Sequence, residues 1–242
     1  MKKHSSLRRI GRLAPRRIST LRLDLALAET ASQMRLSKDV VDSDIIHPFW
    51  DLSLVLFLNR YIEGRSATRV FEYGSGRSSR WLASKGCEVL SVEHDPTWLP
   101  TEADQSRFGF RVLHRPSTGD PVYAPENDPY AGAIEQSKGL YDIVIVDGLS
   151  RMACVERSLP FLAPAGLLVL DDSFRASYDP IHEYVAAAGF TRLDFVGLKQ
   201  GHGHLCASSV YFKYGSAIEN LKTKPVSTYF DGEYDPWSSP VP

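Results

Sequence analysis

VFEYGSGRSS, at residues 70–79, is an apolar run that ends in an acid and two glycines, followed closely by a pair of serines. Glycines at this spacing let the backbone turn sharply and bring its amides close to a ligand. The serines open a helix, whose first turn presents unpaired N–H groups. The stretch therefore predicts a strand, a turn and a helix start that together bind a nucleotide-like ligand.

Strand-like and helix-like segments alternate on both sides of this turn. A helix and a second strand follow it within about 30 residues, as in a βαβ unit. The short gap at 199–204 indicates an antiparallel hairpin between the last two strands. The predicted strands are 70–73, 88–95, 110–114, 141–148, 167–172, 192–198 and 205–214, the helices are 48–64, 78–85, 152–162 and 180–188, and a turn is expected at 163–166. The predicted fold class is therefore α/β, a Rossmann-like, seven-stranded, mostly parallel sheet with helices on both faces and a C-terminal antiparallel hairpin.

The length of 242 residues favours one well-buried domain with appendages. We expect a basic tail at 1–36, the α/β domain at 37–215, and an irregular surface strap with four prolines at 216–242. The polar stretch 117–139 is too long for an ordinary connection. Part of it is expected to form a substrate-facing loop or a short helix.

The composition is that of a soluble globular protein, with 43% hydrophobic and 24% charged residues. No apolar run approaches the roughly 18 residues that a transmembrane helix needs, so no such segment is expected. The three cysteines, Cys87, Cys154 and Cys206, are widely spaced and form no CxxC pair. They indicate neither a disulfide framework nor a zinc cluster, and favour a cytoplasmic location.

The charge is unevenly distributed along the chain. Residues 1–23 carry eight Lys and Arg side chains and no acid, whereas the rest carries 20 basic and 29 acidic side chains. Such a tail is either a solvated segment or a contact for anionic lipid, nucleic acid or targeting machinery. No feature of the sequence indicates an oligomeric state.

Four predicted strands end in carboxylates: Glu72, Glu93, Asp147 and the pair Asp171-Asp172. In an open parallel sheet, ligands bind outside the carboxyl ends of the strands. Each acid alone is also explained as a loop or helix cap, but four at one edge favour a functional site. Glu93 is placed to accept hydrogen bonds from both hydroxyls of a ribose. Glu72 would repel a pyrophosphate, so a cationic ligand suits it better.

These motifs resemble those of the class I S-adenosylmethionine-dependent methyltransferases. The first motif of that family is similar to residues 72–76, with Ser78 where a third glycine is frequent; the ribose-binding acid corresponds to Glu93, and the fourth-strand motif to residues 141–147. The resemblance covers about residues 40–215 and implies S-adenosylmethionine as cofactor. The cofactor-binding residues that it implies, together with those adjacent to its motifs, are Glu72, Tyr73, Gly74, Ser75, Gly76, Ser78, Glu93, His94 and Asp147.

A narrower resemblance is to the metal-dependent O-methyltransferases that act on catechols and on sugars of natural products. Asp147, Asp171 and Asp172 stand at the positions of their metal ligands, which implies Mg²⁺ and a small-molecule or sugar hydroxyl as acceptor. The alternative is structural: Asp147 orders a loop, and Asp171 or Asp172 caps the next helix.

Two histidines in the hairpin gap are candidates for a general base. His202 and His204 each follow a glycine at the predicted active-site edge, and simple exposure at a hairpin tip is the other interpretation. Together with Asp147 they form the predicted catalytic set.

Three other functions are compatible with the pattern. A dinucleotide-dependent oxidoreductase is disfavoured because Ser79 replaces the last glycine of G-x-G-x-x-G and Glu72 precedes it. A binding module without catalysis would retain the sheet and use its basic tail for nucleic acid or a partner. An RNA methyltransferase guided by that tail would bind RNA with steep salt dependence.

Overall fold

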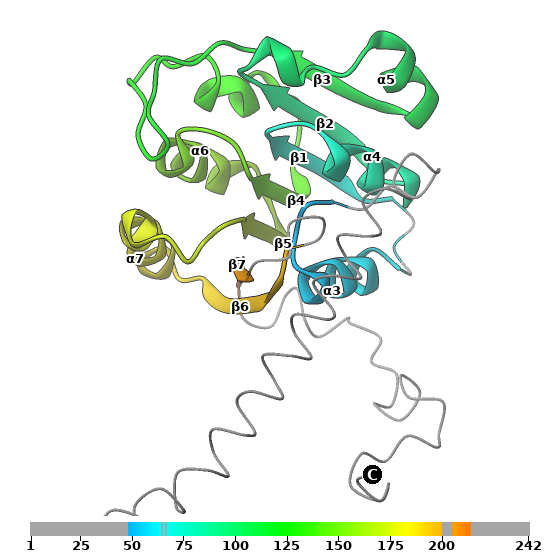
Figure 1. Cartoon of the computed structure of the whole chain (residues 1–242). Coiled ribbons are helices and arrows are strands. Elements are labelled where there is room, and N and C mark those ends of the chain that lie inside the picture. Colours follow the sequence, from blue (N-terminus) through cyan, green and yellow to red (C-terminus); the bar gives the residue numbers. More distant parts are fainter. Residues whose placement is uncertain (1–47, 64, 66, 200–204, 214–242) are drawn as a thin grey trace, which may run out of the picture.

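A single seven-stranded sheet organises the protein, with the strand order β3-β2-β1-β4-β5-β7-β6 (Figure 1). The computed structural model describes residues 48–63, 65, 67–199 and 205–213. The strands are β1 (Arg69–Tyr73), β2 (Glu88–Glu93), β3 (Phe110–His114), β4 (Tyr141–Val146), β5 (Leu162–Leu170), β6 (Thr191–Leu198) and β7 (Leu205–Phe212). The first five strands pair in parallel, and β7 runs antiparallel to both β5 and β6. The predicted fold class is confirmed, with the last strand inserted beside the fifth.

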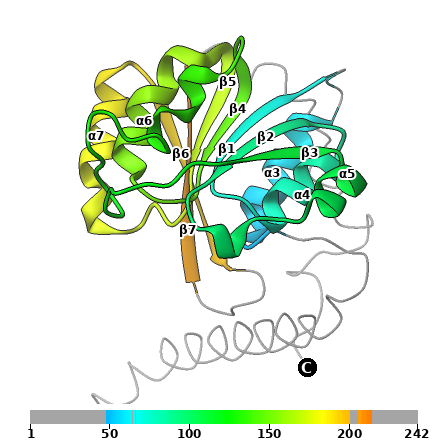
Figure 2. The ribbon, with the colours of Figure 1, turned by 90° about the horizontal axis from the view of Figure 1, so that it is seen from above.

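Helices cover both faces of this sheet, as predicted. They are α3 (Leu52–Ile62), α4 (Arg77–Ser84), α5 (Glu102–Phe108), α6 (Arg151–Ser158) and α7 (Asp179–Ala187). Figure 2 shows α3, α4 and α5 on one side of the strands and α6 and α7 on the other. A strand between two helical layers is buried on both faces, which explains the continuous apolar run in β4.

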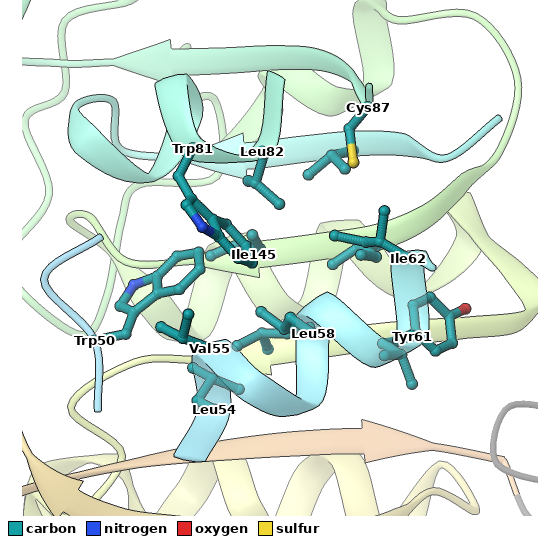
Figure 3. Close-up of a cluster of buried hydrophobic side chains, with 14 of the residues drawn as sticks. Trp50, Leu54, Val55, Leu58, Tyr61, Ile62, Trp81, Leu82, Cys87 and Ile145 are labelled. Carbon is teal, nitrogen blue, oxygen red and sulfur yellow. The ribbon is translucent and has the colours of Figure 1, made fainter. Parts of the chain in front are cut away.

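The two faces of the sheet carry separate hydrophobic cores. Along β4, Ile143 and Ile145 face the core under α3 and α4, while Val144 and Val146 face the core under α6 and α7. This alternation is the two-residue period of a strand. Figure 3 shows the first core, in which side chains of α3 lie opposite Trp81, Leu82 and Ile145.

The helix α3 begins at a capped and buried residue. Asp51 is fully buried, and its Oδ1 accepts a hydrogen bond of 2.8 Å from the backbone N–H of Leu54. This satisfies one of the free N–H groups of the first turn. Just before the cap, the ring of Trp50 packs edge-on against Trp81 of α4, with centroids 6.2 Å apart. The start of α3 is thereby fixed beside the carboxyl end of the sheet.

The structure differs from the sequence-based prediction in two segments. The prediction of a turn at 163–166 is wrong, because these residues belong to β5, which begins at Leu162. Leu162 pairs with Tyr141, and the register of β4 and β5 shifts between Tyr141 and Ile143. The helix α5 is not among the predicted helices. Thr101 caps its start by accepting the N–H of Asp104, and Gly109, in the left-handed conformation, caps its end. Within 117–139, the expected short helix is the 3₁₀ helix η3 (Ala131–Gln136).

Several predictions fall outside the described residues. These are the basic tail 1–36, the first residues of the predicted domain, the strap 216–242, and the two candidate bases His202 and His204. Among the helices that the structure does describe, none has the length and apolar character needed to cross a bilayer.

Leu58 and Leu56 on α3 provide a matched test of this packing. Leu58 is completely buried and Leu56 is 59% exposed. We expect Leu58→Ala to lower the free energy of unfolding by about 2–5 kcal/mol, because it removes buried methyl groups and leaves a cavity. Leu56→Ala should change it by no more than about 0.5 kcal/mol. Urea denaturation measures both values, and equal losses would contradict this placement of α3.

Candidate active site

Two glycines lie where the backbones that follow β1 and β4 approach each other, at the point where the strand order reverses. Gly74 has a φ of +102°, and a Cβ there would lie 3.3 Å from the carbonyl oxygen of Asp147. A Cβ on Gly148 would lie 1.9 Å from the hydroxyl of Tyr130. Neither position has room for a side chain. Glycine at both positions therefore lets the turn after β1 pack against the segment after β4, at the point where open α/β sheets bind a ligand.

A cleft of about 540 Å³ lies at this edge of the sheet. It is lined by the turn 74–76 and the ends of β1, β2 and β4, by the segment 97–101, and by Lys199 after β6. Its volume is in the range of small-molecule sites, about 300–1,000 Å³. The structure therefore brings the predicted glycine turn and three of the predicted acids, Glu72, Glu93 and Asp147, to one cavity, whereas Asp171 and Asp172 do not line it.

Glu72 lies at the floor of the cleft and is fully buried. Its Oε2 accepts hydrogen bonds from the hydroxyls of Ser79, at 2.5 Å, and Ser91, at 2.9 Å. Burial raises the pKa of Glu72, while the hydrogen bonds from serines oppose the rise. A cation bound in the cleft would favour the ionised form of this acid.

Glu93, at the end of β2, is held rigidly by backbone N–H groups. Its Oε1 accepts from His94 and Asp95, at 2.8 and 2.9 Å, and its Oε2 accepts from Ser75, at 2.9 Å. The carboxylate thus links the end of β2 to the glycine turn after β1. Oε2 accepts only one hydrogen bond and retains a lone pair for a ligand hydroxyl, whereas Oε1 already accepts two.

Three further carboxylates, Asp147, Asp171 and Asp172, form an acid cluster after β4 and β5. Asp147 lines the cleft with a side chain that is 26% exposed, and it accepts hydrogen bonds from Trp50, at 3.1 Å, and Arg151, at 3.4 Å. Desolvation and the nearby charge of Asp171 raise the pKa of Asp147 well above its ordinary range. The prediction that these acids share one edge of the sheet is met in the structure.

Basic side chains neutralise the acid cluster. The Nζ of Lys199 lies 3.0 Å from Asp171 Oδ2 and 2.9 Å from Asp172 Oδ1. Arg175 donates to the other oxygen of Asp172 at 2.7 Å. Burial alone would favour neutral Asp172, but the hydrogen bond and charge of Lys199 outweigh it and lower the pKa of Asp172.

The acid cluster does not fit a divalent cation in this arrangement. All six carboxylate oxygens already accept a hydrogen bond from a protein donor, including Ser208, which donates to Asp171 Oδ1 at 2.7 Å. Within the part of the chain that the structure describes, no group of three or more His, Cys, Asp or Glu side chains is arranged to hold a metal ion. We therefore derive no catalytic step from Mg²⁺ at Asp147, Asp171 and Asp172.

The structure places most of the predicted cofactor residues around the cleft. Its lining includes Glu72, Gly74, Ser75, Gly76, Ser78, Glu93, His94 and Asp147. Tyr73 is the exception, because its side chain is buried in the core under α6 and donates to the carbonyl oxygen of Ala131 at 2.8 Å. It contributes to the site through its backbone, which accepts the N–H of Asp147 at 3.0 Å.

Sequence reasoning missed several contributors to the site, among them two residues of the cleft and two that hold Asp147. Trp98, which is 60% exposed, and Lys199 line the cleft, while Trp50 and Arg151 bind Asp147. Arg151 stands four residues after Asp147 at the start of a helix, a spacing that sequence inspection can find. Trp98 and Lys199 follow β2 and β6, and only the fold brings them together.

Comparisons with known proteins support the fold. No protein-family model matches the sequence, and a search of curated proteins finds no match. Among solved structures, a Staphylococcus aureus protein described as a caffeoyl-CoA O-methyltransferase is 14% identical with a TM-score of 0.52, over 81% of this chain and 99% of that one. A Bacillus cereus O-methyltransferase solved with S-adenosylhomocysteine is 15% identical with a TM-score of 0.52, over 77% and 90%. The chain therefore has the Rossmann-like fold of class I methyltransferases.

Replacement of Glu72 tests its buried environment. Because burial raises the pKa of Glu72 in the folded protein, the unfolded chain ionises first as pH rises above 4.5, and the folded state loses stability through this window. Glu72→Gln has no carboxyl group at this position and lacks this loss. The difference in Tm, variant minus wild type, should therefore increase from about pH 4 to pH 7. Thermal unfolding at several pH values measures the difference. Glu156→Gln, on the exposed side of α6, should follow the wild-type curve, and a pH-independent difference for Glu72→Gln would contradict the assignment.

Proposed function

We propose that this protein is an S-adenosylmethionine-dependent O-methyltransferase that methylates a hydroxyl group of a small-molecule or sugar acceptor. The observation that carries the proposal is the placement of two buried carboxylates, Glu72 and Glu93, on either side of the glycine turn in one cleft. S-adenosylmethionine supplies a methyl group on a positively charged sulfur, which keeps the bonding electron pair when the methyl group leaves. A cleft with these acids suits such a cation.

The same acids argue against a dinucleotide. A pyrophosphate beside the turn 74–76 would lie near Glu72 and Glu93, and like charges in a partly desolvated cleft repel strongly. Ser79, at the position of the missing last glycine, instead donates its hydroxyl to Glu72. The residue that departs from the dinucleotide motif therefore stabilises the acid that a dinucleotide would disfavour.

Each part of the cofactor has a suitable partner in the cleft. Glu93 offers the remaining lone pair of Oε2 to a ribose hydroxyl, and the backbone of Gly74 and Gly148 lines the same cleft. The exposed indole of Trp98 gives a flat surface for the adenine ring. Glu72 supplies negative charge near the methionine end.

Asp147 is the proposed proton acceptor for the acceptor hydroxyl. It lines the cleft beyond the glycine turn, and Trp50 and Arg151 fix the orientation of its carboxylate. An acceptor bound beside Asp147 would present its hydroxyl to this carboxylate, which would take the proton as the oxygen gives an electron pair to the methyl carbon. Rate enhancement then arises mainly from positioning and proton removal.

We place the protein in the cytoplasm. All three cysteines are buried free thiols, which is compatible with a reducing compartment. The acceptor class, a catechol-like or sugar hydroxyl, is supported by the positions of the three acids after β4 and β5, which are those of the small-molecule O-methyltransferases that the sequence resembles.

Binding of S-adenosylmethionine tests the proposed cofactor. We expect isothermal titration calorimetry to detect one site per chain, and Glu93→Gln to weaken binding by about 10- to 100-fold, since hydrogen bonds to charged groups contribute about 1.5–3 kcal/mol. Asp95→Asn is the matched control: Asp95 caps Thr97 in the same turn but does not line the cleft. Binding of NAD⁺ in preference to S-adenosylmethionine would contradict the proposal.

Asp147→Asn tests the proton acceptor. We expect kcat to fall by about 10²- to 10⁴-fold, with little change in S-adenosylmethionine affinity, because a general base acts on the chemical step. Formation of S-adenosylhomocysteine with a panel of catechol and sugar acceptors measures the rate. Asp142→Asn, which alters the opposite end of β4, should retain activity. An unchanged kcat in Asp147→Asn would remove Asp147 from this role.

A further inference from the structure

We infer that Lys199 takes the place of a divalent cation at the acceptor end of the cleft, so that the acid cluster Asp147, Asp171 and Asp172 acts without a bound metal. A role for Lys199 in methyl transfer rests on the proposed function, whereas the ion pairs of Lys199 with Asp171 and Asp172 do not depend on it.

The first observation is the bridging position of the ammonium group. Lys199 Nζ contacts one oxygen of Asp171 and one of Asp172, at 3.0 and 2.9 Å. A metal ion shared by two neighbouring carboxylates would need these same oxygens. The Lys199 side chain is 13% exposed, and Asp171 is completely buried, so the contacts are shielded from water.

The second observation is the balance of charge. The three carboxylates face three cations, because Arg151 pairs with Asp147, Lys199 with Asp171 and Asp172, and Arg175 with Asp172. A further ion of charge +2 would lie close to the Lys199 ammonium in a desolvated site. That repulsion is large where water is excluded.

The third observation is the anchoring of the Lys199 backbone. Lys199 forms a β-bridge with Asp51, the residue that caps α3. Two residues earlier, a Cβ on Gly197 would lie only 3.3 Å from the Cβ of Asp51, so β6 passes close to the cap. The ammonium therefore projects from a fixed backbone position.

Lys199 also reaches the cleft itself, beside Asp147 and Gly148. An ammonium group has three N–H donors, and the two aspartates use two of them. The third is the donor for the acceptor oxygen. In this arrangement Lys199 stabilises negative charge on that oxygen while Asp147 removes its proton, and the acceptor is a hydroxyl that binds a cationic hydrogen-bond donor.

Manganese binding tests the exchange of lysine for metal. The full chain, freed of metal by a chelator, is titrated with Mn²⁺ and followed by electron paramagnetic resonance. We expect the wild type to show no specific site, and Lys199→Met to gain one site per chain that binds about tenfold or more tightly than the wild type, because a repelling cation is gone. Lys199→Arg keeps the charge and should show no gain, and Lys138→Met, on the exposed surface, is the matched control.

Activity provides the second readout. Chelation should leave the rate of methyl transfer by the wild type unchanged. Lys199→Met should lower kcat by a larger factor than it lowers the affinity for S-adenosylmethionine. Lys199→Arg should retain part of the wild-type kcat. A stoichiometric Mn²⁺ site in the wild type, or activity lost on chelation and restored by Mg²⁺, would overturn the inference. So would a Lys199→Met variant that folds and gains no site.

If Lys199→Met does not fold in metal-free buffer, the inference is tested with Lys199→Gln and by refolding Lys199→Met with and without Mn²⁺. Recovery of folded protein by Mn²⁺ supports the inference, since a ligand that binds only the folded state stabilises it, and failure to recover contradicts it. The Mn²⁺ measurements need no cofactor. Failure of the wild type to bind S-adenosylmethionine would therefore refute the proposed function. The Mn²⁺ measurements would still test whether Lys199 excludes a metal ion from the acids.

Discussion

The close approach of two backbones at the carboxyl edge of the sheet determines the arrangement of the site. The turn at Gly74 lies against Asp147, and its N–H donates to Val92 at 2.8 Å, so the ends of β1, β2 and β4 are fixed relative to one another. A side chain at Gly74 would separate them. Because the two backbones approach closely, Glu93 can accept the N–H of Ser75 across the turn, and Glu72 and Glu93 both line the cleft.

Much of the fold follows from local sequence signals. The glycine turn, the buried runs of β4 and β5 and the short hairpin gap determine a doubly covered sheet, because strand period and connection length leave few topologies. Most of the cofactor side of the cleft follows as well. Glu72 and Glu93 lie at strand ends next to the turn, and the carboxyl ends of parallel strands share one edge.

The acceptor side was less predictable for a physical reason. The sequence shows Asp171 and Asp172 as free acids suited to a metal, whereas their charges are neutralised by Lys199, 27 residues farther along the chain. Such a pairing depends on the insertion of β7 beside β5, which no local pattern specifies. Tyr73 illustrates the opposite error: it belongs to the motif, yet strand alternation directs its side chain into the core.

The position of β6 at the edge of the sheet affects the order in which the protein is assembled. β6 joins the sheet only through β7, the last strand among the described residues. On the ribosome, the glycine turn and Glu93 can form while the C-terminal residues are still in the exit tunnel. The bridge to Asp51 holds the backbone of Lys199, but the strand β6 that precedes it pairs with the sheet only after β7 has emerged. The nascent chain can therefore complete its cofactor half before its reacting half, because β6, which precedes Lys199, pairs with the sheet only once β7 has been made.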